Sequence, residues 1–367
     1  MSPVLIGFSV FAAGVFALIG LFAEWHYRQL PELPTQPANL PTSSVEVIVP
    51  ARNEAATIER VTASLLALHY PTFLVTVIDD HSTDNTAMLA VGVGANVIRL
   101  EAEPPPGWTG KCNACDQGAR RSEADWLLFT DADTYHTPDS LACAVAYAES
   151  HHLDAISLLL RQEFVGFWDR LILPLAYQNY FAVLRPSKPA FNGQYILIRR
   201  SVYNESGGFG AVRGRVMEDV ALAELLADQG YKTALLNGHQ VASVRMYADL
   251  SALLHGMTKT AFTAARDRGA VGWLLGSVTF IGVFVIAMFA YGVLSGQTPL
   301  IGAALLICAV NGLGLLPWLS RFGVRPTYAA LNLIGIGVLW LIGMVGTFRA
   351  LRGVGVRWKD RVIIETR

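Results

Sequence analysis

Long apolar runs without charged residues occur near both ends of the chain, and a more polar segment separates them. Residues 3–23 and 269–320 contain no charged side chain, and a third apolar run covers residues 327–348. Because a bilayer core needs about 20 apolar residues per helix, this pattern predicts one span at the start and three after the polar segment. Two of the three lie within 269–320 and are separated near residues 295–299, Ser-Gly-Gln-Thr-Pro. The chain is therefore predicted to be a multi-pass membrane protein.

The first apolar run has two interpretations, a cleaved signal peptide or a retained membrane helix. No basic region precedes it, and residues 24–28, Glu-Trp-His-Tyr-Arg, follow it. Such residues are typical of an anchor at the membrane surface rather than of a cleavage site, so a retained helix is expected. The hydrophobic content of 53% agrees with several buried spans.

Basic residues predict the side of the membrane on which the polar segment lies. Arg28 follows the first span, and Lys259, Arg266 and Arg268 precede the second. By the positive-inside rule the segment between them faces the cytoplasm, and the protein lies in the cell (inner) membrane. Three later crossings would place the basic tail, 349–367, on the opposite side, which conflicts with the same rule. Either one apolar run is re-entrant or the number of crossings differs by one.

The polar segment alternates β-rich runs with amphipathic stretches. A Pro-rich linker, 31–41, precedes it, and strands are expected at 45–49, 74–78, 96–100 and 126–129. Helical spacing follows the first strand at Ile58, Val61, Leu65 and Leu68. This alternation predicts an α/β fold with a mainly parallel sheet, helices on both faces, and a ligand at the carboxyl ends of the strands.

Five segments follow from these patterns. They are a first transmembrane helix with its linker (1–44), an α/β domain (45–245), an interfacial amphipathic helix (246–268), transmembrane helices (269–348) and a basic tail (349–367). The interfacial helix is expected because apolar residues from Met246 to Ala261 recur at helical spacing, with Lys259 and Arg266 opposite. Residues 164–184 form a second candidate, which contains Asp169 and Arg170. For both segments a buried core helix is the alternative.

Acidic residues follow three of the expected strands, beginning with Glu54 in the loop after the first. The second strand ends in Asp79-Asp80, and the last ends in Asp131-Ala132-Asp133. Two carboxylates one residue apart at the end of a strand suit a divalent cation, because alternate side chains point the same way and hard cations prefer oxygen ligands. Ordinary turn and capping chemistry is the alternative for these residues. Glu218-Asp219 opens a later helix, where acids complement the helix dipole or provide a base.

Other features exclude some classes of function. The net charge of −1 gives no indication of nucleic-acid binding. Cys112 and Cys115 form one CxxC motif, but no second Cys or His pair follows at ligand spacing, so packing thiols are expected rather than a zinc or redox site.

Taken in order, these loops resemble the family 2 glycosyltransferases, whose catalytic domain has the nucleotide-sugar-binding GT-A fold, over residues 45–247. The resemblance implies that the nucleoside is bound by the residues Pro50, Arg52, Glu54 and Asp80. It further implies a phosphate-side lysine at Lys111 and a metal-binding pair at Asp131 and Asp133. Asp219 corresponds to the catalytic base, with Glu218 beside it, and Arg245 is assigned to the diphosphate or to the acceptor.

Flanking sequences narrow the resemblance. The run 104–111, Pro-Pro-Pro-Gly-Trp-Thr-Gly-Lys, together with Arg245-Met246-Tyr247 and the tail around Trp358, is similar to membrane glycosyltransferases associated with hopanoid and carotenoid synthesis. Asp360 stands where that group has glycine. Gln240 lies five residues before Arg245 and no Trp follows, which disfavours a processive polymerase.

The expected function is that of an inverting hexosyltransferase that moves a sugar from a nucleotide sugar, with a UDP-sugar as the expected donor, to a membrane lipid. The resemblance implies an isoprenoid, hopanoid or carotenoid acceptor, and the oxygen ligands favour Mg²⁺ or Mn²⁺. A polyprenyl phosphate is the alternative acceptor. A transporter or flippase that retains a nucleotide-sugar domain is the alternative from another class. Such a protein is expected to carry ionisable residues inside its spans, and these spans offer little beyond the polar Asn311 and Asn332. A glycosidase is disfavoured because its two carboxylates flank the bond rather than bind a metal.

Overall fold

The structure, a computed structural model, describes residues 3–183, 190–266, 270–352, 356–358 and 361–363. Arg268, Lys359 and Asp360 lie outside the described residues. Contacts divide the chain into two units. The α/β unit comprises Leu30–Glu163, Ser187–Met246 and Trp358–Arg367, and the helical unit comprises Met1–Gln29, Phe164–Pro186 and Tyr247–Arg357. Residues 164–183, which interrupt the α/β unit in sequence, therefore belong with the apolar helices.

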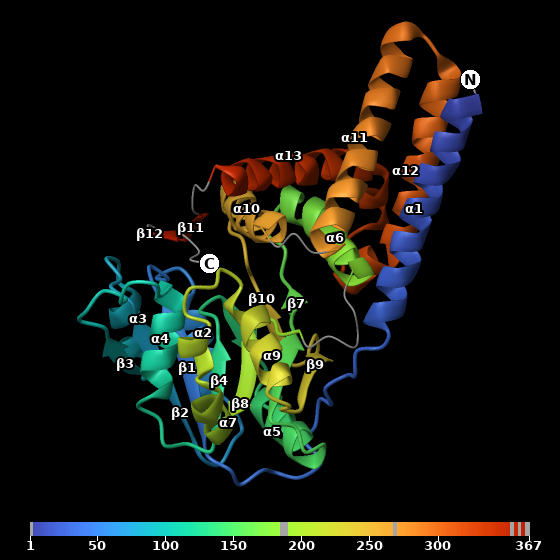
Figure 1. Ribbon diagram of the computed structural model, residues 1–367. Coiled ribbons are helices and arrows are strands. Elements are labelled where there is room, and N and C mark those ends of the chain that lie inside the picture. Colours follow the sequence, from blue (N-terminus) through green and yellow to red (C-terminus); the bar gives the residue numbers. More distant parts are fainter. Residues whose placement is uncertain (1–2, 184–189, 267–269, 353–355, 359–360, 364–367) are drawn as a thin grey trace. The chain divides into compact units, whose positions relative to one another are not determined.

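Strands of the α/β unit form a seven-stranded sheet in the order β3-β2-β1-β4-β8-β6-β9 (Figure 1). Their bounds are β1 Val45–Ala51, β2 Phe73–Asp79, β3 Asn96–Arg99, β4 Trp126–Thr130, β6 Ala155–Leu159, β8 Tyr195–Arg199 and β9 Thr233–Asn237. β1 to β4 pair in parallel, as do β6 and β9, whereas β8 runs antiparallel to β4 and β6. The predicted α/β fold with a mainly parallel sheet is confirmed, and β1 to β4 match the four predicted strands.

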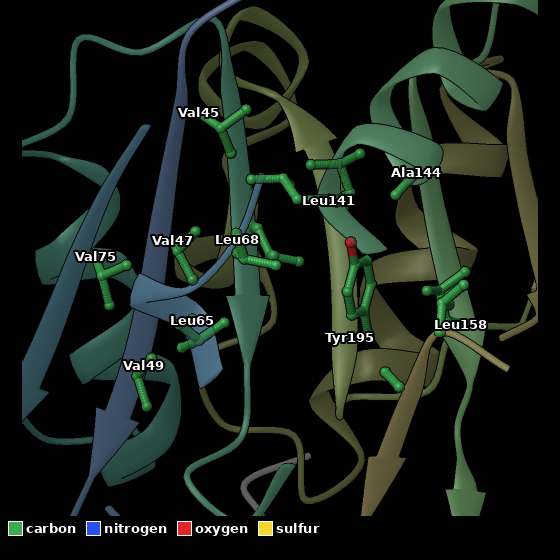
Figure 2. Close-up of a cluster of buried hydrophobic side chains, with 14 of the residues drawn as sticks. Val45, Val47, Val49, Leu65, Leu68, Val75, Leu141, Ala144, Leu158 and Tyr195 are labelled. Atoms are coloured by element: carbon green, nitrogen blue, oxygen red, sulfur yellow. The ribbon is translucent and has the colours of Figure 1, made fainter. Parts of the chain in front are cut away.

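Alternation along the strands separates two hydrophobic cores, one on each face of this sheet. Val45, Val47 and Val49 of β1 point into one core, whereas Ile48 points into the other. Figure 2 shows the first core, where Leu65 and Leu141 also lie. Helices α2 (Ile58–Leu66), α3 (Thr86–Val93) and α5 (Ser140–Ser150) contribute to it. Helices α4 (Gly110–Ala119), α7 (Arg200–Ser206), α8 (Gly208–Ala211) and α9 (Glu218–Asp228) contribute to the second.

A second, three-stranded sheet begins directly after the acidic turn that follows β4. It consists of β5 (Thr134–His136), β10 (Ala242–Val244) and β7 (Arg161–Gln162), in the order β5-β10-β7. Thr134 pairs with Val244, and the backbone N–H of Arg245 donates to the carbonyl of Asp133 at 3.0 Å. This pairing joins the turn at residues 131–133 to a segment more than 100 residues later. Near the C-terminus, β11 (Val356–Trp358) and β12 (Arg361–Ile363) form a two-stranded sheet.

Apolar helices make up the helical unit. They are α1 (Pro3–Tyr27), α6 (Phe167–Val183), α10 (Leu250–Arg266), α11 (Ala270–Ser295), α12 (Thr298–Arg321), the 3₁₀ helix η1 (Pro326–Leu331) and α13 (Asn332–Leu351). Among the described residues, Pro3–Tyr27, Thr298–Arg321 and Pro326–Leu351 are long and apolar enough to cross a membrane. These include the predicted first and last spans.

Small residues allow α1 and α12 to approach closely. A Cβ atom added to Gly20 would lie 2.9 Å from the Cα of Gly314, so the two backbones cross where neither residue has a side chain. One turn further along, Arg321 bonds to the Glu24 carboxylate at 2.6 Å and stacks on the ring of Tyr27 at 4.0 Å. The two helices therefore end side by side.

Two buried asparagines of the apolar helices, Asn311 and Asn332, are hydrogen-bonded within the unit. The side chain of Asn332 donates to the carbonyl of Cys308 at 2.9 Å and accepts from Asn311 at 3.4 Å. On α10, Leu253 is buried against Leu171 and Ile172 of α6, so part of the apolar stripe of that helix is used in packing between helices. All four cysteines of the chain are free thiols.

Candidate functional site

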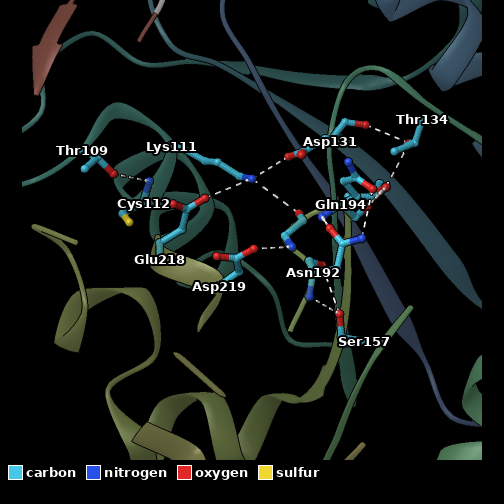
Figure 3. A network of polar contacts seen from close by, with 12 residues as sticks. Thr109, Lys111, Cys112, Asp131, Thr134, Ser157, Asn192, Gln194, Glu218 and Asp219 are labelled. Carbon is cyan, nitrogen blue, oxygen red and sulfur yellow. Dashed lines mark hydrogen bonds and ion pairs between the residues drawn. The ribbon is translucent and has the colours of Figure 1, made fainter. Parts of the chain in front are cut away.

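Lys111 connects two acidic segments at the carboxyl edge of the sheet (Figure 3). It stands in the first turn of α4, where the hydroxyl of Thr109 caps the helix by accepting from the N–H of Cys112. Its Nζ lies 2.7 Å from Oδ1 of Asp131 and 3.1 Å from Oε1 of Glu218. Burial alone would lower the pKa of Lys111, but the charges of Asp131 and Glu218 outweigh this and hold the pKa well above its usual value.

Asp219 and Glu218 occupy the first turn of α9. Oδ2 of Asp219 accepts a hydrogen bond from the N–H of Gly193 at 2.8 Å, and Oδ1 accepts from the N–H of Val220 at 2.9 Å. Burial, followed by the neighbouring charge of Glu218, raises the pKa of Asp219. A carboxyl whose pKa is raised toward neutrality is better suited to take up a proton than an exposed one.

The turn at residues 192–194 completes this side of the site, and the sequence analysis did not identify it. The carbonyl of Gly193 accepts from Nζ of Lys111 at 3.4 Å, while its N–H donates to Asp219. A Cβ atom on Gly193 would lie 3.1 Å from both of these side chains. The Asn-Gly dipeptide before β8 is a turn signal that could have indicated this segment, but its contacts with Lys111 and Asp219 are not local in sequence.

Asp133 lies on the other side of the turn that begins with Asp131. Its Oδ1 atom is buried and has no hydrogen-bond partner among the described residues. Burial, followed by the charges of Asp131 and Glu54, raises the pKa of Asp133 from 3.8 to about 8. The neutral form of Asp133 is therefore favoured when no cation is bound. The backbone of Arg245 is bonded to Asp133, while the Arg245 side chain is exposed.

Arg52 and Asp80 form a buried pair at the ends of β1 and β2. Nη1 of Arg52 donates to the carbonyl of Asp80 at 2.6 Å and lies 4.0 Å from its carboxylate, which also contacts Nδ1 of His81 at 2.9 Å. The N–H of Glu54 donates to the hydroxyl of Thr86 at 2.8 Å, which ties the first loop to the second. The loop residues predicted at these strand ends are thus joined to one another.

A small pocket that is open to solvent lies between these segments. Its lining consists of Pro50, Lys111, Cys115, Phe129, Thr130, Asp131, Gly193, Ile196, Phe209, Glu218 and Asp219. Pro50, Lys111, Asp131, Glu218 and Asp219 had been selected from the sequence, whereas the apolar walls and Gly193 had not. In the part of the chain that the structure describes, Arg52, Glu54, Asp80, Asp133 and Arg245 do not line this pocket.

The carboxylates of the site could supply only some of the ligands that a divalent cation needs. No group of three or more His, Cys, Asp or Glu side chains suited to a metal ion occurs within the described residues. Mg²⁺ and Mn²⁺ in phosphate-handling sites take one or two carboxylates from the protein and complete their coordination with phosphate oxygens and water. The pair Asp131 and Asp133, with the partnerless buried oxygen of Asp133, fits that type of site.

Comparison with known proteins connects this geometry to a family. Residues 46–207 match the model of glycosyl transferase family 2. The 4,4'-diaponeurosporenoate glycosyltransferases of Staphylococcus aureus strains N315 and MRSA252 are 27% and 26% identical over 272 residues, which cover 70% of this chain and 72% of each relative. Among solved structures, a mannosyltransferase from Pyrobaculum calidifontis in complex with GDP-Man and Mn²⁺ is similar, with a TM-score of 0.63, 20% identity, and coverage of 95% of this chain and 97% of that one. Residues 46–207 therefore form a family 2 glycosyltransferase domain of the GT-A fold, and the protein is a glycosyltransferase.

Proposed function

We propose that this glycosyltransferase moves a hexosyl group from a nucleotide sugar to a membrane lipid, with inversion at the anomeric carbon. The observation that supports this most directly is the Lys111 ammonium between Asp131 and Glu218, with Asp219 held beside them by Gly193. A cation, a lysine and a carboxyl with a raised pKa are the groups needed to stabilise a leaving diphosphate and to accept a proton.

On the donor side, Asp131 and Asp133 would hold a Mg²⁺ or Mn²⁺ ion, which supplies positive charge to the diphosphate when it is bound. Lys111 would add a further positive charge as the sugar–phosphate bond breaks. Arg245, whose backbone is bonded to Asp133, is close enough in the fold to assist the diphosphate or the acceptor. We assign Pro50, Arg52, Glu54 and Asp80 to the nucleoside and take a UDP-sugar as the donor.

On the acceptor side, Asp219 in its ionised form would remove the proton of the attacking hydroxyl as the new bond to the anomeric carbon forms. Glu218 would stay paired with Lys111, and its charge would increase the affinity of the Asp219 carboxylate for the proton that it takes up. A single displacement inverts the anomeric centre because attack and departure occur on opposite faces of the sugar.

A lipid acceptor is favoured by the apolar helices, several of which are long enough to cross a membrane. The names of the staphylococcal relatives indicate a carotenoid acid as their acceptor, and we extend an isoprenoid, carotenoid or hopanoid acceptor to this chain. The distribution of Arg28 and Lys259 supports a location in the inner membrane with the α/β unit on the cytoplasmic side. A transport function is less well supported, since Asn311 and Asn332 bond to each other and to the backbone.

The test measures release of nucleoside diphosphate by the purified protein in membranes, with a panel of nucleotide sugars, bacterial lipid extract and Mn²⁺ or Mg²⁺. Lipid-dependent release is expected, and Asp219→Asn should lower it by about 10²-fold or more. Asp228→Asn is the matched control, because Asp228 is an exposed carboxylate at the other end of α9. Release without lipid would indicate hydrolysis or a soluble acceptor, and equal activity of the two variants would remove Asp219 from the role of base. Preference for a polyprenyl phosphate in the panel would select the alternative acceptor.

A further inference from the structure

His136 is a buried imidazole in β5 that the proposed chemistry does not use. Only 1% of the residue is exposed. Its Nε2 atom lies 3.1 Å from the hydroxyl of Thr130 and 3.1 Å from the hydroxyl of Thr134. We call these three residues the threonine–histidine clasp. Thr130 ends β4 and Thr134 begins β5, so the clasp brackets the turn that carries Asp131 and Asp133.

Each hydroxyl of the clasp lies within hydrogen-bond distance of a backbone carbonyl, and the two hydroxyl oxygens lie 3.0 Å from each other. The hydroxyl of Thr130 donates to the carbonyl of Gln194 at 2.9 Å, and that of Thr134 donates to the carbonyl of Asp131 at 2.8 Å. A carbonyl can only accept, so when both hydroxyls donate to their carbonyls neither has a proton left for the imidazole. This arrangement assigns the proton to Nε2 of His136, which shares it between the two hydroxyl oxygens.

The imidazole of His136 is neutral and therefore has a single N–H donor. Burial lowers the pKa of His136 to about 3, so the ring is neutral at any pH at which an enzyme works. Its Nδ1 atom has no hydrogen-bond partner among the described residues, as expected for the unprotonated nitrogen in an apolar place. The ring packs beside that of Tyr195 at a centroid distance of 5.6 Å, which fixes its plane.

The two carbonyls held by the clasp belong to opposite sides of the site. Asp131 contacts Lys111 and precedes the second acid of the metal-binding pair. Gln194 follows Gly193, whose N–H bonds Asp219 and whose carbonyl bonds Lys111. In Figure 3, Thr134 and Gln194 lie at one side of the network that includes Asp131 and Asp219. The N–H group of His136 thus orients the hydroxyls of Thr130 and Thr134. Thr134 in turn bonds the turn of the metal-binding acids, and Thr130 bonds the turn that contacts Asp219.

We propose that His136 is a positioning residue that sets the separation between the Asp131–Asp133 turn and the Gly193 turn by donating from Nε2 to Thr130 and Thr134. This inference rests on the proposed function, because it gives the two turns their roles. Partners of this kind around metal ligands change metal affinity by about 10- to 100-fold when removed. A buried histidine with a purely structural role would instead change the stability of the fold alone.

Two substitutions of His136 distinguish a positioning role from a purely structural role, because they place a hydrogen-bond donor at different distances from Cα. The amide nitrogen of glutamine is as many bonds from Cα as Nε2 of histidine, whereas that of asparagine corresponds to Nδ1. His136→Gln should therefore preserve the clasp and His136→Asn should lose it. The measurement is titration of free Mn²⁺ by electron paramagnetic resonance in the presence of UDP or of GDP, at a temperature at which thermal unfolding of both variants has not begun. We expect His136→Asn to weaken Mn²⁺ binding by about tenfold or more and His136→Gln to lie within a few-fold of the wild type.

Turnover gives a second readout. Loss of positioning should raise the Mn²⁺ concentration needed for half-maximal activity more than it lowers kcat at saturating Mn²⁺. Thr134→Val and Thr134→Ser form a second pair, in case His136→Asn fails to fold. Removing the hydroxyl should weaken Mn²⁺ binding as His136→Asn does, and retaining it should not.

The outcomes distinguish this inference from the proposed function. If the wild type binds Mn²⁺ with UDP or GDP but His136→Asn and Thr134→Val bind it equally well, the clasp has no positioning role and the proposed function stands. Equal weakening by His136→Gln and His136→Asn would overturn the argument from the Nε2 donor. If the wild type binds no Mn²⁺ with either nucleotide, the metal-dependent mechanism fails, and the role of the clasp fails with it.

Discussion

The ammonium of Lys111 lies 2.7 Å from Oδ1 of Asp131, so a positive charge of the protein already contacts a carboxylate that we assign to the metal. Lys111 also contacts Glu218 at 3.1 Å. A divalent cation that binds Asp131 must compete with this lysine, since both need the same oxygen. When a diphosphate is present, its oxygens give Lys111 another partner, so donor and metal should bind together more readily than the metal binds alone.

This competition predicts opposite effects of Lys111→Met on two measurements. Without nucleotide, the variant should bind Mn²⁺ several-fold more tightly than the wild type, because the competing ammonium is gone. With donor and acceptor, turnover should fall by about 10²- to 10³-fold, because a charge that stabilises the leaving diphosphate is missing. Mn²⁺ titration and initial rates check the two effects. Lys232→Met is the control, because Lys232 is exposed and lies just before β9. Unchanged Mn²⁺ affinity in the absence of nucleotide would contradict the competition.

Gly193→Ala should impair catalysis without unfolding the protein. The added Cβ would lie 3.1 Å from both Oδ2 of Asp219 and Nζ of Lys111, so these side chains must shift by a few tenths of an ångström. Misplacement of a base and a cation should lower kcat by about tenfold or more. Steady-state kinetics and thermal unfolding of the same preparations measure the two properties. Gly92→Ala is the control, because its Cβ would meet nothing within 4 Å and Gly92 lies in α3 of the same unit. If both variants keep full kcat, the Gly193 turn does not position the site.

The stability of the metal-free protein should depend on the ionisation of Asp133. Its pKa is raised from 3.8 to about 8, so the folded state binds this proton more tightly than the unfolded state. The stabilising effect of the neutral carboxyl is fully present below about pH 4 and is lost as the pH rises toward 8. Asp133→Asn removes this dependence, so in the presence of a chelator the variant should have a higher Tm than the wild type at pH 8.

The Tm values of the wild type and Asp133→Asn should also be compared at a second pH and in the presence of Mn²⁺. At pH 5 the advantage of Asp133→Asn should be much smaller, because most Asp133 carboxyls of the wild type are protonated there. Mn²⁺ should raise the Tm of the wild type at pH 8 and have less effect on the variant. Asp228→Asn serves as control for a change of charge on the exposed surface. The same Tm for wild type and Asp133→Asn at pH 8 would mean that the Asp133 carboxylate is not destabilised by its neighbours.

The positions that sequence reasoning identified share one property, which is that their signals are local. The apolar runs of β1, β2 and β4 and the acids directly after them depend on strand periodicity and turn chemistry within a few residues. Because parallel strands deliver their carboxyl ends to one edge, the convergence of Pro50, Asp80 and Asp131 followed from those runs. The roles of Lys111 and Asp219 came from the resemblance alone, and the contact between Lys111 and Asp131 was not predicted.

Elements that were missed depend on pairing between distant segments. β8 runs antiparallel between β4 and β6, with Leu128 opposite Leu197, and this insertion carries the Gly193 turn to the site. No periodicity in residues 190–199 indicates which strand they join. The assignment of α6 to the helical unit is of the same kind, since its apolar residues find partners on helices that come more than 60 residues later. Tertiary packing determines which strands pair and which helices pack together, and a single sequence does not contain a local signal for it.

Glu24 and Arg321 tie the ends of α1 and α12 together, and their contribution can be measured as a coupling. Each single change, Glu24→Gln or Arg321→Met, removes the ion pair between the two helix ends and should lower the stability of the detergent-solubilised protein by about 2 kcal/mol. The double variant should be less destabilised than the sum by about 1 kcal/mol, because the ion pair that each change removes is lost only once. Arg28→Met is the control, since Arg28 also contacts Glu24 but is 75% exposed and should contribute under about 0.5 kcal/mol. Unfolding by heat or denaturant gives the four values of the cycle, and strict additivity would show that the two helix ends are held by packing of Gly20 against Gly314 rather than by the ion pair.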